Sequence, residues 1–425
     1  MARLLCIGGE DHALRIPFLI ALRDEGFRIS AAATADPAPF EREGIDYHPF
    51  CFNRFANPFA DLIAVKALAK LIARVGPDLV QSFDTKPNLL VPLAARAVAG
   101  VTVVRTINGL AYVYSSRSPK ALAVRPIWRA LHHMAARSTH ATVFQNRDDQ
   151  AFFQDRHMIG AGLSRLIAGS GLDVARFDRA AESGPSPEEL RRAFGLNGCE
   201  IVVTVTRLTR QKGIPALLEA AALVHRRRPG VRFLLVGPRE SEGSLAISKA
   251  EIDRHAPYVV AAGPRSDVPA LLRLADVFAF PTEYREGIPR VLLEAGAAAL
   301  PIVTTAMPGC RDVIRDRWNG FLVPPRSPEL LADRIIDLLE DRDTAKAMGA
   351  RASALVRQDY NLDIIVARYA ALYQELMNGS DRIDVPTPMR ASAAVRAADA
   401  GTADSHAAAW DVTALSRHAG LEARD

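Results

Sequence analysis

The sequence predicts an α/β protein made of two parallel-sheet domains in tandem. Short β-rich runs alternate with helix-length stretches twice along the chain, and a glycine-rich segment at residues 169–171 separates the two series. Such alternation is typical of parallel sheets joined by crossover helices. With 425 residues, 49% of them hydrophobic, the chain is long enough for two ordinary cores.

The first series predicts one domain over residues 1–168. Its expected strands are residues 3–7, 78–83, 101–106 and 140–145, and its clearest helices are residues 16–25 and 61–75. The first strand runs into Gly8 and Gly9, so the apolar stretch is too short for a signal peptide.

The second series predicts a domain over residues 169–355, followed by a C-terminal helix, residues 356–378, that packs back on the first domain. Its expected strands are residues 201–206, 232–236, 258–261, 277–280 and 301–304. Residues 379–425 have almost no aromatic side chains and predict a disordered tail. Ligands of open α/β sheets bind beyond the carboxyl ends of the strands, so we expect the site in a cleft between the two domains.

Bulk composition excludes several classes of protein. The longest apolar runs are strand-sized and fall well short of the roughly 20 residues that span a bilayer. The four cysteines, Cys6, Cys51, Cys199 and Cys310, lack the spacing of a disulfide framework or a zinc site. These features favour a protein of the reducing cytoplasm.

The strongest chemical signal lies between Glu286 and Glu294, directly after the expected strand at residues 277–280. Pro289 suits the first turn of a helix, and the backbone amides at such a start would be free to seat a phosphate. Two flanking carboxylates suit the hydroxyl groups of a nucleotide sugar. On spacing alone, the alternative that Glu286 complements the helix dipole and Glu294 is solvated stays open.

A second signal follows the strand at residues 201–206. Arg207 and Lys212 lie between this strand and the next helix, where both can face the cleft. Two cations there would neutralise the charge that builds on a departing diphosphate. A solvated basic loop is the alternative.

Together, the two motifs resemble glycosyltransferase family 4, retaining enzymes of GT-B fold with two Rossmann-like domains and an interdomain cleft. The segments at residues 83–88, 106–110 and 169–173 are similar to one branch of the family. That branch builds capsular, exopolysaccharide and O-antigen units on a polyprenyl-diphosphate carrier. The resemblance covers residues 1–378, with departures at Asn108 (commonly His), near Ala299 (often Gly) and at Asp312 (usually Glu).

The resemblance implies a role for each candidate residue. The catalytic residues would be Arg207 and Lys212, at the diphosphate, and Glu286, at the transferred sugar. The donor would also meet Gly8, Gly9, Gly287, Ile288, Pro289, Arg290 and, at its ribose, Glu294, whereas Lys86 and Asn108 would lie at the acceptor. Neither a metal ion nor another cofactor is expected, and the departing phosphate oxygen, rather than a side chain, would take the acceptor's proton.

The expected reaction moves a hexosyl or N-acetylhexosaminyl group from a nucleoside-diphosphate sugar to a lipid-linked saccharide during surface polysaccharide synthesis. No Asp or Glu occurs between Thr85 and Arg147, against nine Lys or Arg. Within this region, residues 118–137 predict either an interfacial helix on anionic lipid or a packed helix with a basic outer face. The lipid-linked acceptor favours peripheral attachment to the inner face of the cell membrane. His132 and His133 are expected at the surface.

Two other classes of function are alternatives, namely other enzymes of related fold and a nucleic-acid-binding protein. A nucleotide-sugar epimerase or a NAD-dependent dehydrogenase would also use paired Rossmann-like domains. The basic first domain would also suit a nucleic-acid-binding protein, although few aromatic residues accompany its cations and the Glu286 motif stays unexplained. We therefore expect no nucleic-acid partner.

Overall fold

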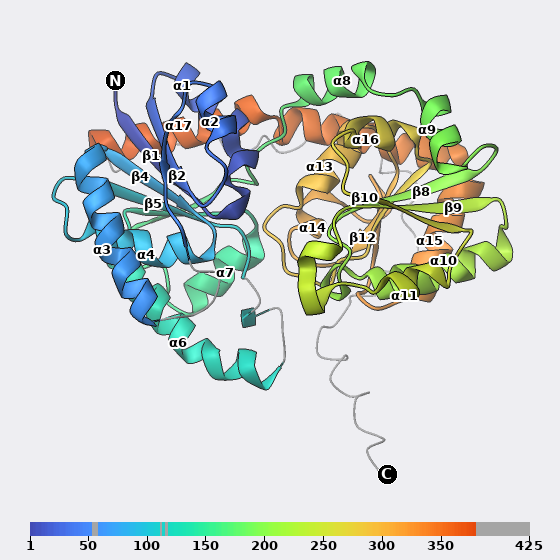
Figure 1. Ribbon diagram of the computed structural model, residues 1–425, viewed down its shortest axis with the longest axis horizontal. Helices are drawn as coiled ribbons and strands as arrows, with labels where there is room; N and C mark the ends of the chain where they lie inside the picture. Colours follow the sequence, from blue (N-terminus) through green and yellow to red (C-terminus); the bar gives the residue numbers. More distant parts are fainter. Residues whose placement is uncertain (53–57, 111–112, 115–117, 380–425) are drawn as a thin grey trace, which may run out of the picture. The chain divides into compact units, whose positions relative to one another are not determined.

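The computed structural model describes residues 1–52, 58–110, 113–114 and 118–379. Residues 1–383 form one compact unit that contains two parallel β-sheets, each covered by helices on both faces (Figure 1). The predicted fold class is confirmed. The tail expected at residues 379–425 lies, apart from Gly379, outside the described residues.

The first sheet has seven parallel strands in the order β3-β2-β1-β4-β5-β6-β7. The strands are β1 Arg3–Ile7, β2 Arg28–Ala33, β3 Asp46–Pro49, β4 Leu79–Phe83, β5 Thr102–Ile107, β6 Ala141–Phe144 and β7 Leu163–Leu166. The helices among them are η1 Glu10–Arg15, α1 Ile16–Asp24, α2 Ala38–Arg42, α3 Pro58–Val75, α4 Thr85–Ala95, α6 Pro119–Ala136 and α7 Arg147–Asp155. The strand order reverses between β1 and β4, and the loops after these two strands therefore open at a topological switch point.

The second sheet has six parallel strands in the order β10-β9-β8-β11-β12-β13. They are β8 Glu200–Val205, β9 Val231–Val236, β10 Val259–Gly263, β11 Val277–Phe280, β12 Ile302–Thr305 and β13 Phe321–Val323. Its helices are α8 Val174–Ser183, α9 Pro187–Phe194, η2 Arg210–Lys212, α10 Ile214–Arg227, η3 Glu240–Leu245, α11 Lys249–Asp253, α12 Val268–Leu274, α13 Arg290–Ala297, α14 Cys310–Val313, α15 Pro328–Glu340 and α16 Arg342–Asp359. The switch point of this sheet lies between β8 and β11, the strands that precede the two sequence motifs.

Every strand expected from the sequence is present, with bounds shifted by a residue or two. The strands that sequence analysis missed have weak β signals. β2 is rich in alanine, β3 is a polar edge strand, β7 contains Ser164 and Arg165, and β13 has three residues. Their pairing with an established neighbour, rather than their own composition, makes them strands.

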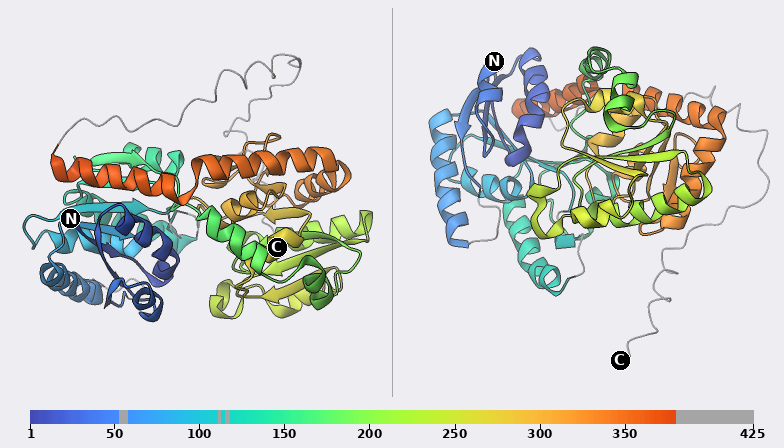
Figure 2. Two further views of the ribbon diagram at one scale, coloured as in Figure 1. Left: turned by 90° about the horizontal axis from the view of Figure 1, so that it is seen from above. Right: turned by 45° about the vertical axis from the view of Figure 1, so that its right-hand side comes forward.

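The last helix, α17 Leu362–Asn378, packs on the first sheet. Its residues Ile365 and Tyr369 are buried in the same hydrophobic core as α1, and the Tyr373 hydroxyl donates to Gln81 Oε1 of β4 at 2.9 Å. The preceding helix, α16, packs instead against α13 of the second half. Figure 2 shows α16 and α17 following one another along one side of the molecule. The chain thus returns to its first half at Tyr360 and Asn361.

Candidate active site

The centre of the site is an ion pair between the two motifs at the second switch point. The Lys212 ammonium of η2 contacts the Glu286 carboxylate on the loop after β11, and both side chains are mostly buried. The Lys212 Nζ atom also lies 5.6 Å and 5.7 Å from the ring centres of Phe280 and Tyr284. Burial strengthens an ion pair because it lowers the effective dielectric constant. The arrangement fixes a cation and a carboxylate side by side at the end of the sheet.

Close packing of the two motif loops depends on Gly213. This residue has a φ of +72°, and a Cβ atom added to it would lie 1.8 Å from the carbonyl oxygen of Pro281. Only glycine satisfies both requirements. The loop after β8 can therefore bring Lys212 directly against the loop that carries Glu286.

Arg207, the other predicted cation, has a different partner. Its Nη1 atom lies 3.0 Å from Glu242 Oε2, and about half of its side chain is exposed, 49%. The structure therefore brings Lys212 and Glu286 together and leaves Arg207 at the rim of the same loop.

The segment from Glu286 to Ile288 is held by the first half of the molecule. The Gly287 amide donates to the Asn108 carbonyl at 3.1 Å, and the Ile288 amide donates to Gln145 Oε1 at 3.2 Å. Asn146 Nδ2 donates to the carbonyl oxygens of Glu286 and Gly287 at 3.0 and 3.2 Å. The expectation that the Gly287 and Ile288 amides are free is therefore wrong for this structure, because first-half oxygens already accept from both.

Pro289, expected in the first turn of a helix, lies just before the first helical residue of α13. Pro289 is the N-cap, and Arg290 and Val291, the first helical residues, have no hydrogen-bond partner for their amides among the described residues. Glu294 lies one turn further on, and its carboxylate accepts from Arg290 Nε at 2.9 Å. Burial raises the pKa of Glu294, although the Arg290 charge opposes this effect. The Glu294 side chain is only 17% exposed, so the alternative that it is solvated does not hold.

The first half contributes Gly8, Gly9 and an acid that sequence analysis missed, Asp84. The Gly9 amide donates to Asp84 Oδ2 at 2.9 Å, and Arg15 Nη2 lies 2.8 Å from Asp84 Oδ1. Burial alone would raise the pKa of Asp84, but Arg15 and the Gly9 amide outweigh it and hold that pKa below its usual range. Asp84 has a φ of +68°, which is strained for a residue with a Cβ atom.

Asn108 connects the two switch points. Its side-chain Nδ2 donates to Asp84 Oδ1 at 3.1 Å, and its carbonyl accepts from Gly287, next to Glu286. Lys86 lies elsewhere: its ammonium pairs with Asp61 of α3 at 2.7 Å. Of the two predicted acceptor residues, the structure brings Asn108 to the site and places Lys86 against α3.

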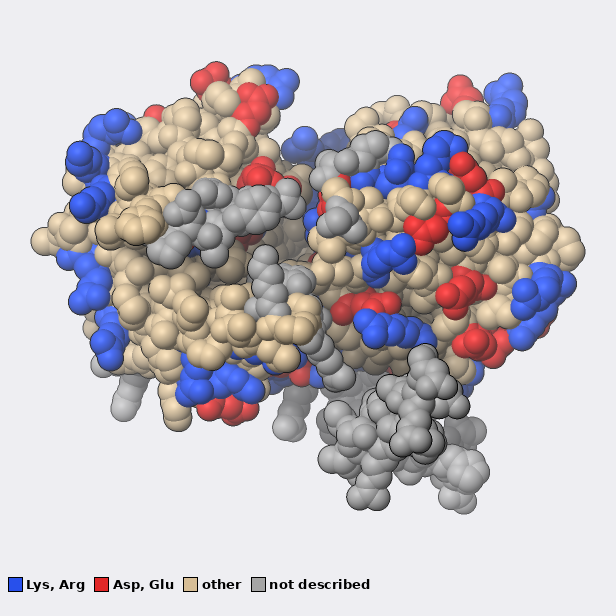
Figure 3. Space-filling view, turned by 60° about the horizontal axis from the view of Figure 1, so that its bottom comes forward, with Lys and Arg blue, Asp and Glu red and all other residues tan. Residues whose placement is uncertain are grey.

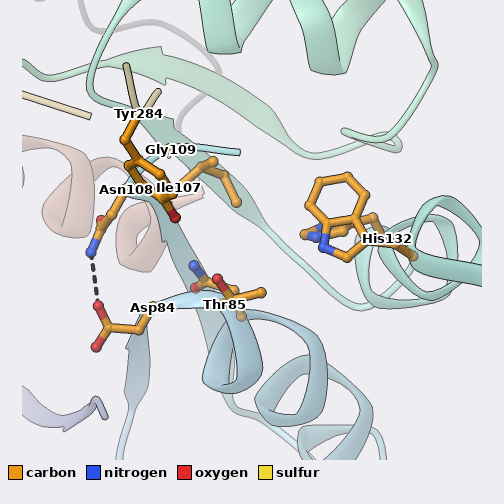
Figure 4. Close-up of a pocket in the computed structure, with 9 residues that line it drawn as sticks. Asp84, Thr85, Ile107, Asn108, Gly109, His132 and Tyr284 are labelled. Carbon is orange, nitrogen blue, oxygen red and sulfur yellow. Dashed lines mark hydrogen bonds between the residues drawn. The ribbon is translucent and has the colours of Figure 1, made fainter. Parts of the chain in front are cut away.

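A pocket opens beside Asn108. Its volume is about 190 Å³, and it is lined by Asp84, Thr85, Asn88, Ile107, Asn108, Gly109, Trp128, His132 and Tyr284. Figure 4 shows Asp84, Thr85 and Asn108 on one side of this space and His132 across from them. The expectation that His132 is a surface residue is wrong, since the side chain is buried between α6 and the first sheet, where it contacts Arg105 of β5.

Gln145, Asn146 and Asp149 are further residues that sequence analysis missed. Asp149 is fully buried and pairs with Arg285, and burial raises the pKa of Asp149 to about 6. Gln145 and Asn146 follow β6 directly and Asp149 lies in the first turn of the next helix, so their place after a strand of the first sheet is the signal that could have revealed them.

The described residues contain neither a cluster of metal ligands nor a helix that could cross a membrane. No three His, Cys, Asp or Glu side chains in this part of the chain gather as metal ligands would. Likewise, none of its helices combines the length and the apolar character that crossing a bilayer requires.

Known proteins resemble both halves of the chain. Residues 18–158 match the family model of Glycosyltransferase Family 4, and residues 186–354 match that of Glycosyl transferases group 1. The chain is 26% identical over 375 residues to the N,N'-diacetylbacillosaminyl-diphospho-undecaprenol alpha-1,3-N-acetylgalactosaminyltransferase of Campylobacter jejuni, covering 87% of this chain and 97% of the relative. It is 25% identical over 286 residues to the UDP-Gal:alpha-D-GlcNAc-diphosphoundecaprenol alpha-1,3-galactosyltransferase of Escherichia coli, covering 66% and 71%.

A solved structure extends the likeness to the fold. The crystal structure of Anabaena HepE in complex with UDP superposes with a TM-score of 0.71 at 20% identity, covering 88% of this chain and all of that one. The fold and the site thus define a glycosyltransferase with two Rossmann-like domains. The chain belongs to glycosyltransferase family 4, as the two family models, one in each half, indicate.

Proposed function

We propose that this glycosyltransferase moves a sugar from a nucleoside-diphosphate sugar to a saccharide carried on a polyprenyl diphosphate, with retention of the anomeric configuration. The observation that carries the proposal is the contact between Lys212 and Glu286 at the switch point of the second sheet. The names of the Campylobacter and Escherichia relatives, both of which specify a diphospho-undecaprenol acceptor, support the acceptor class.

Each group has a defined task in this proposal. An ammonium has three donors, so Lys212 can keep Glu286 while it also binds a phosphate oxygen. Arg207 can turn from Glu242 towards the outer phosphate because half of its side chain is exposed. Glu286 accepts hydrogen bonds from sugar hydroxyls, and Glu294 does so from the ribose. The amides of Arg290 and Val291 face the phosphates at the positive end of α13.

The bond changes balance without a side-chain nucleophile. The bond between the anomeric carbon and the diphosphate oxygen breaks, and the acceptor hydroxyl oxygen bonds to the same face of that carbon. The proton of the acceptor hydroxyl passes to the departing phosphate oxygen. Lys212 and Arg207 stabilise the charge on the leaving group, and we propose that the reaction proceeds without a metal ion.

A second part of the proposal is peripheral attachment to an anionic membrane. Ten large apolar side chains are exposed in the described part of the chain. Six of them are Phe59, Leu62 and Ile63 of α3 and Leu122, Ile127 and Met134 of α6. Exposed cations on the same helices are Lys66, Lys70, Arg74 and Arg129.

Both helices pack against α4, so their outer faces lie on one side of the first sheet. Figure 3 shows Lys and Arg side chains, together with some Asp and Glu, along the margin of this half, around a broad area in which the visible described residues carry no charge. An apolar patch with a basic rim suits the headgroup region of anionic lipids. Location at the inner face of the cell membrane follows from this attachment and the lipid-linked acceptor.

The test is a transfer assay. Purified protein is incubated with a panel of nucleoside-diphosphate sugars and short-chain prenyl-diphosphate saccharides. We expect nucleoside diphosphate release together with a glycolipid one sugar longer, whose new linkage has the donor's anomeric configuration by NMR. If the protein isomerises a sugar nucleotide in the absence of any acceptor, the epimerase alternative is supported. If no combination of donor and acceptor gives a product, the proposal is contradicted.

A further inference from the structure

The pocket beside Asn108 belongs almost entirely to the first half of the molecule. Among the described residues that line it, eight come from the start of α4 and its N-cap Asp84, from the end of β5 and the loop after it, and from α6, and Tyr284 alone comes from the second half. The Lys212–Glu286 pair, which the donor requires, lies on the second sheet. The pocket is therefore on the acceptor side of the reacting centre.

Arg105 fixes the chemistry of one wall. Its fully buried guanidinium donates to Thr142 Oγ1 at 3.0 Å and to the Met158 carbonyl at 2.6 Å, and its Nη1 atom lies 3.3 Å from His132 Nδ1. A guanidinium has donors only, so His132 Nδ1 must accept and the ring proton must sit on Nε2. Burial, reinforced by the Arg105 charge, holds the pKa of His132 well below its usual range, so the ring stays neutral.

Trp128 adds a second donor to the same wall. It lies one helical turn before His132 on α6, and the centres of the two rings are 3.9 Å apart. Trp128 is 5% exposed and His132 is 2% exposed. Among the described residues, neither Trp128 Nε1 nor His132 Nε2 has a hydrogen-bond partner. Two adjacent N–H groups without acceptors are rare in a buried wall, and they indicate a ligand oxygen.

The opposite wall carries acceptors. Asn108 Oδ1 has no partner among the described residues, while the Asn108 Nδ2 atom donates to the Asp84 carboxylate. This end suits a hydroxyl group of a sugar, which can donate to Asn108 Oδ1. The volume of about 190 Å³ leaves room for a sugar ring.

We propose that this pocket binds the acceptor sugar that carries the reacting hydroxyl, and that Trp128 and His132 select a sugar bearing an acetamido group. A carbonyl oxygen accepts two hydrogen bonds and donates none, which matches two N–H donors. Asn108 and Asp84 hold hydroxyl groups of the same ring at the end nearest Glu286. This inference rests on the proposed function and adds the class of acceptor sugar to it.

The test compares two prenyl-diphosphate acceptors that differ only in an acetamido or a hydroxyl group on the sugar. Trp128→Phe keeps an aromatic ring and removes the N–H group. We expect the wild type to prefer the acetamido acceptor, and Trp128→Phe to lose about tenfold in kcat/KM for this acceptor alone, as the loss of one hydrogen bond predicts. The KM for the donor should not change.

Phe153→Leu is the matched control. Phe153 packs against Trp128 and His132 with ring-centre distances of 5.8 and 5.0 Å, but it does not line the pocket. Its substitution disturbs the same core and should leave the preference between the two acceptors unchanged. A loss of preference in Phe153→Leu equal to that in Trp128→Phe would assign the effect to packing and overturn the proposal.

A second measurement is made on the wild-type protein, and variants serve only to assign one resonance. The chain has three tryptophans, and Trp318→Phe and Trp410→Phe identify the indole N–H resonance of Trp128 by elimination. The acetamido acceptor should shift this resonance, and the hydroxyl acceptor should not. This inference alone is refuted if transfer occurs, the resonance does not move, and Trp128→Phe keeps the wild-type preference between the two acceptors. The proposed function is refuted if no lipid-linked acceptor receives a sugar.

Discussion

At the scale of single residues, the most consequential contact is that between Lys212 and Glu286. Lys212→Met removes the buried cation and leaves the carboxylate unpaired. We expect kcat to fall by at least about 100-fold, the usual effect of removing one preorganised stabiliser of developing charge. Steady-state transfer assays at saturating donor measure this fall.

The control for Lys212→Met is Arg210→Met, two residues earlier in the same loop. Arg210 is exposed and pairs with Glu251, so its loss should leave kcat near the wild-type value. Glu286→Gln combined with Lys212→Met should cost less than the sum of the single changes, because the two side chains share one interaction. Wild-type kcat in Lys212→Met would show that leaving-group stabilisation lies elsewhere.

Asp149 gives a pH dependence. Burial raises its pKa from 3.8 to about 6, so the folded protein binds this proton more tightly than the unfolded chain. The contribution of Asp149 to the free energy of unfolding is therefore largest at low pH and is lost as the pH rises through about 6. Between pH 5 and pH 8 the free energy of unfolding of the wild type should fall by about 1.4 kcal/mol relative to that of Asp149→Asn.

Thermal denaturation of both proteins at pH 5, 6.5 and 8 measures this difference. Because the comparison is made between the same two proteins at each pH, any constant cost of the Asn substitution cancels. A wild type that gains stability relative to Asp149→Asn over this range would contradict the raised pKa.

The sequence reveals some of these residues and hides others for a physical reason. Lys212 and Glu286 follow apolar strands within short motifs, so their position at a strand end can be predicted locally. Asp84 and His132 acquire their roles from neighbours far along the chain, namely Gly9 and Arg105. A buried partner of that kind leaves no mark in the spacing around either residue.

At the scale of elements, the loop after β8 depends on Gly213. Gly213→Ala must relieve both the positive φ and the contact with Pro281, and we expect it to lower the free energy of unfolding by about 2–4 kcal/mol. Gly198→Ala is the matched control, since Gly198 has a φ of +71° but nothing within 4 Å of an added Cβ atom. Gly198→Ala should lower the free energy of unfolding by about 1 kcal/mol. Urea titrations of the wild type and both alanine variants measure these differences.

Equal costs for the two alanine variants would mean that the loops after β8 and β11 separate without penalty. In that case Lys212 would not be held against Glu286 by packing, and the donor site would form only when the substrate binds.

Helix α6 shows how far the element level could be predicted. The sequence left open whether residues 118–137 form a packed or an interfacial helix, and the structure shows a helix with a buried inner face and an outer face that exposes apolar side chains. Trp128 and His132 lie inward at the pocket, while Leu122 and Ile127 are exposed. The 3.6-residue period predicts a helix but cannot say which of two apolar stripes the sheet covers, because both stripes contain large side chains.

At the scale of the whole molecule, the exposed faces of α3 and α6 predict binding to anionic vesicles. Ile127→Glu places a charge where an apolar side chain would enter the headgroup region. We expect its partitioning onto phosphatidylglycerol vesicles to fall about tenfold, with transfer to a water-soluble acceptor unchanged. Vesicle sedimentation measures the bound fraction.

Leu330→Glu is the control, because Leu330 is an exposed apolar residue of α15 in the second half. It should bind vesicles as the wild type does. Equal binding by Ile127→Glu and the wild type would contradict attachment through α6.

The return of α17 to the first sheet has a consequence for biosynthesis. Its side chains Ile365, Tyr369 and Tyr373 complete a core that begins at Leu4. While the ribosome is still translating the second sheet, the first sheet lacks that cover and exposes apolar surface. The earliest part of the chain to be made therefore finishes folding after the middle part, and a nascent chain stopped before codon 362 should depend on chaperones.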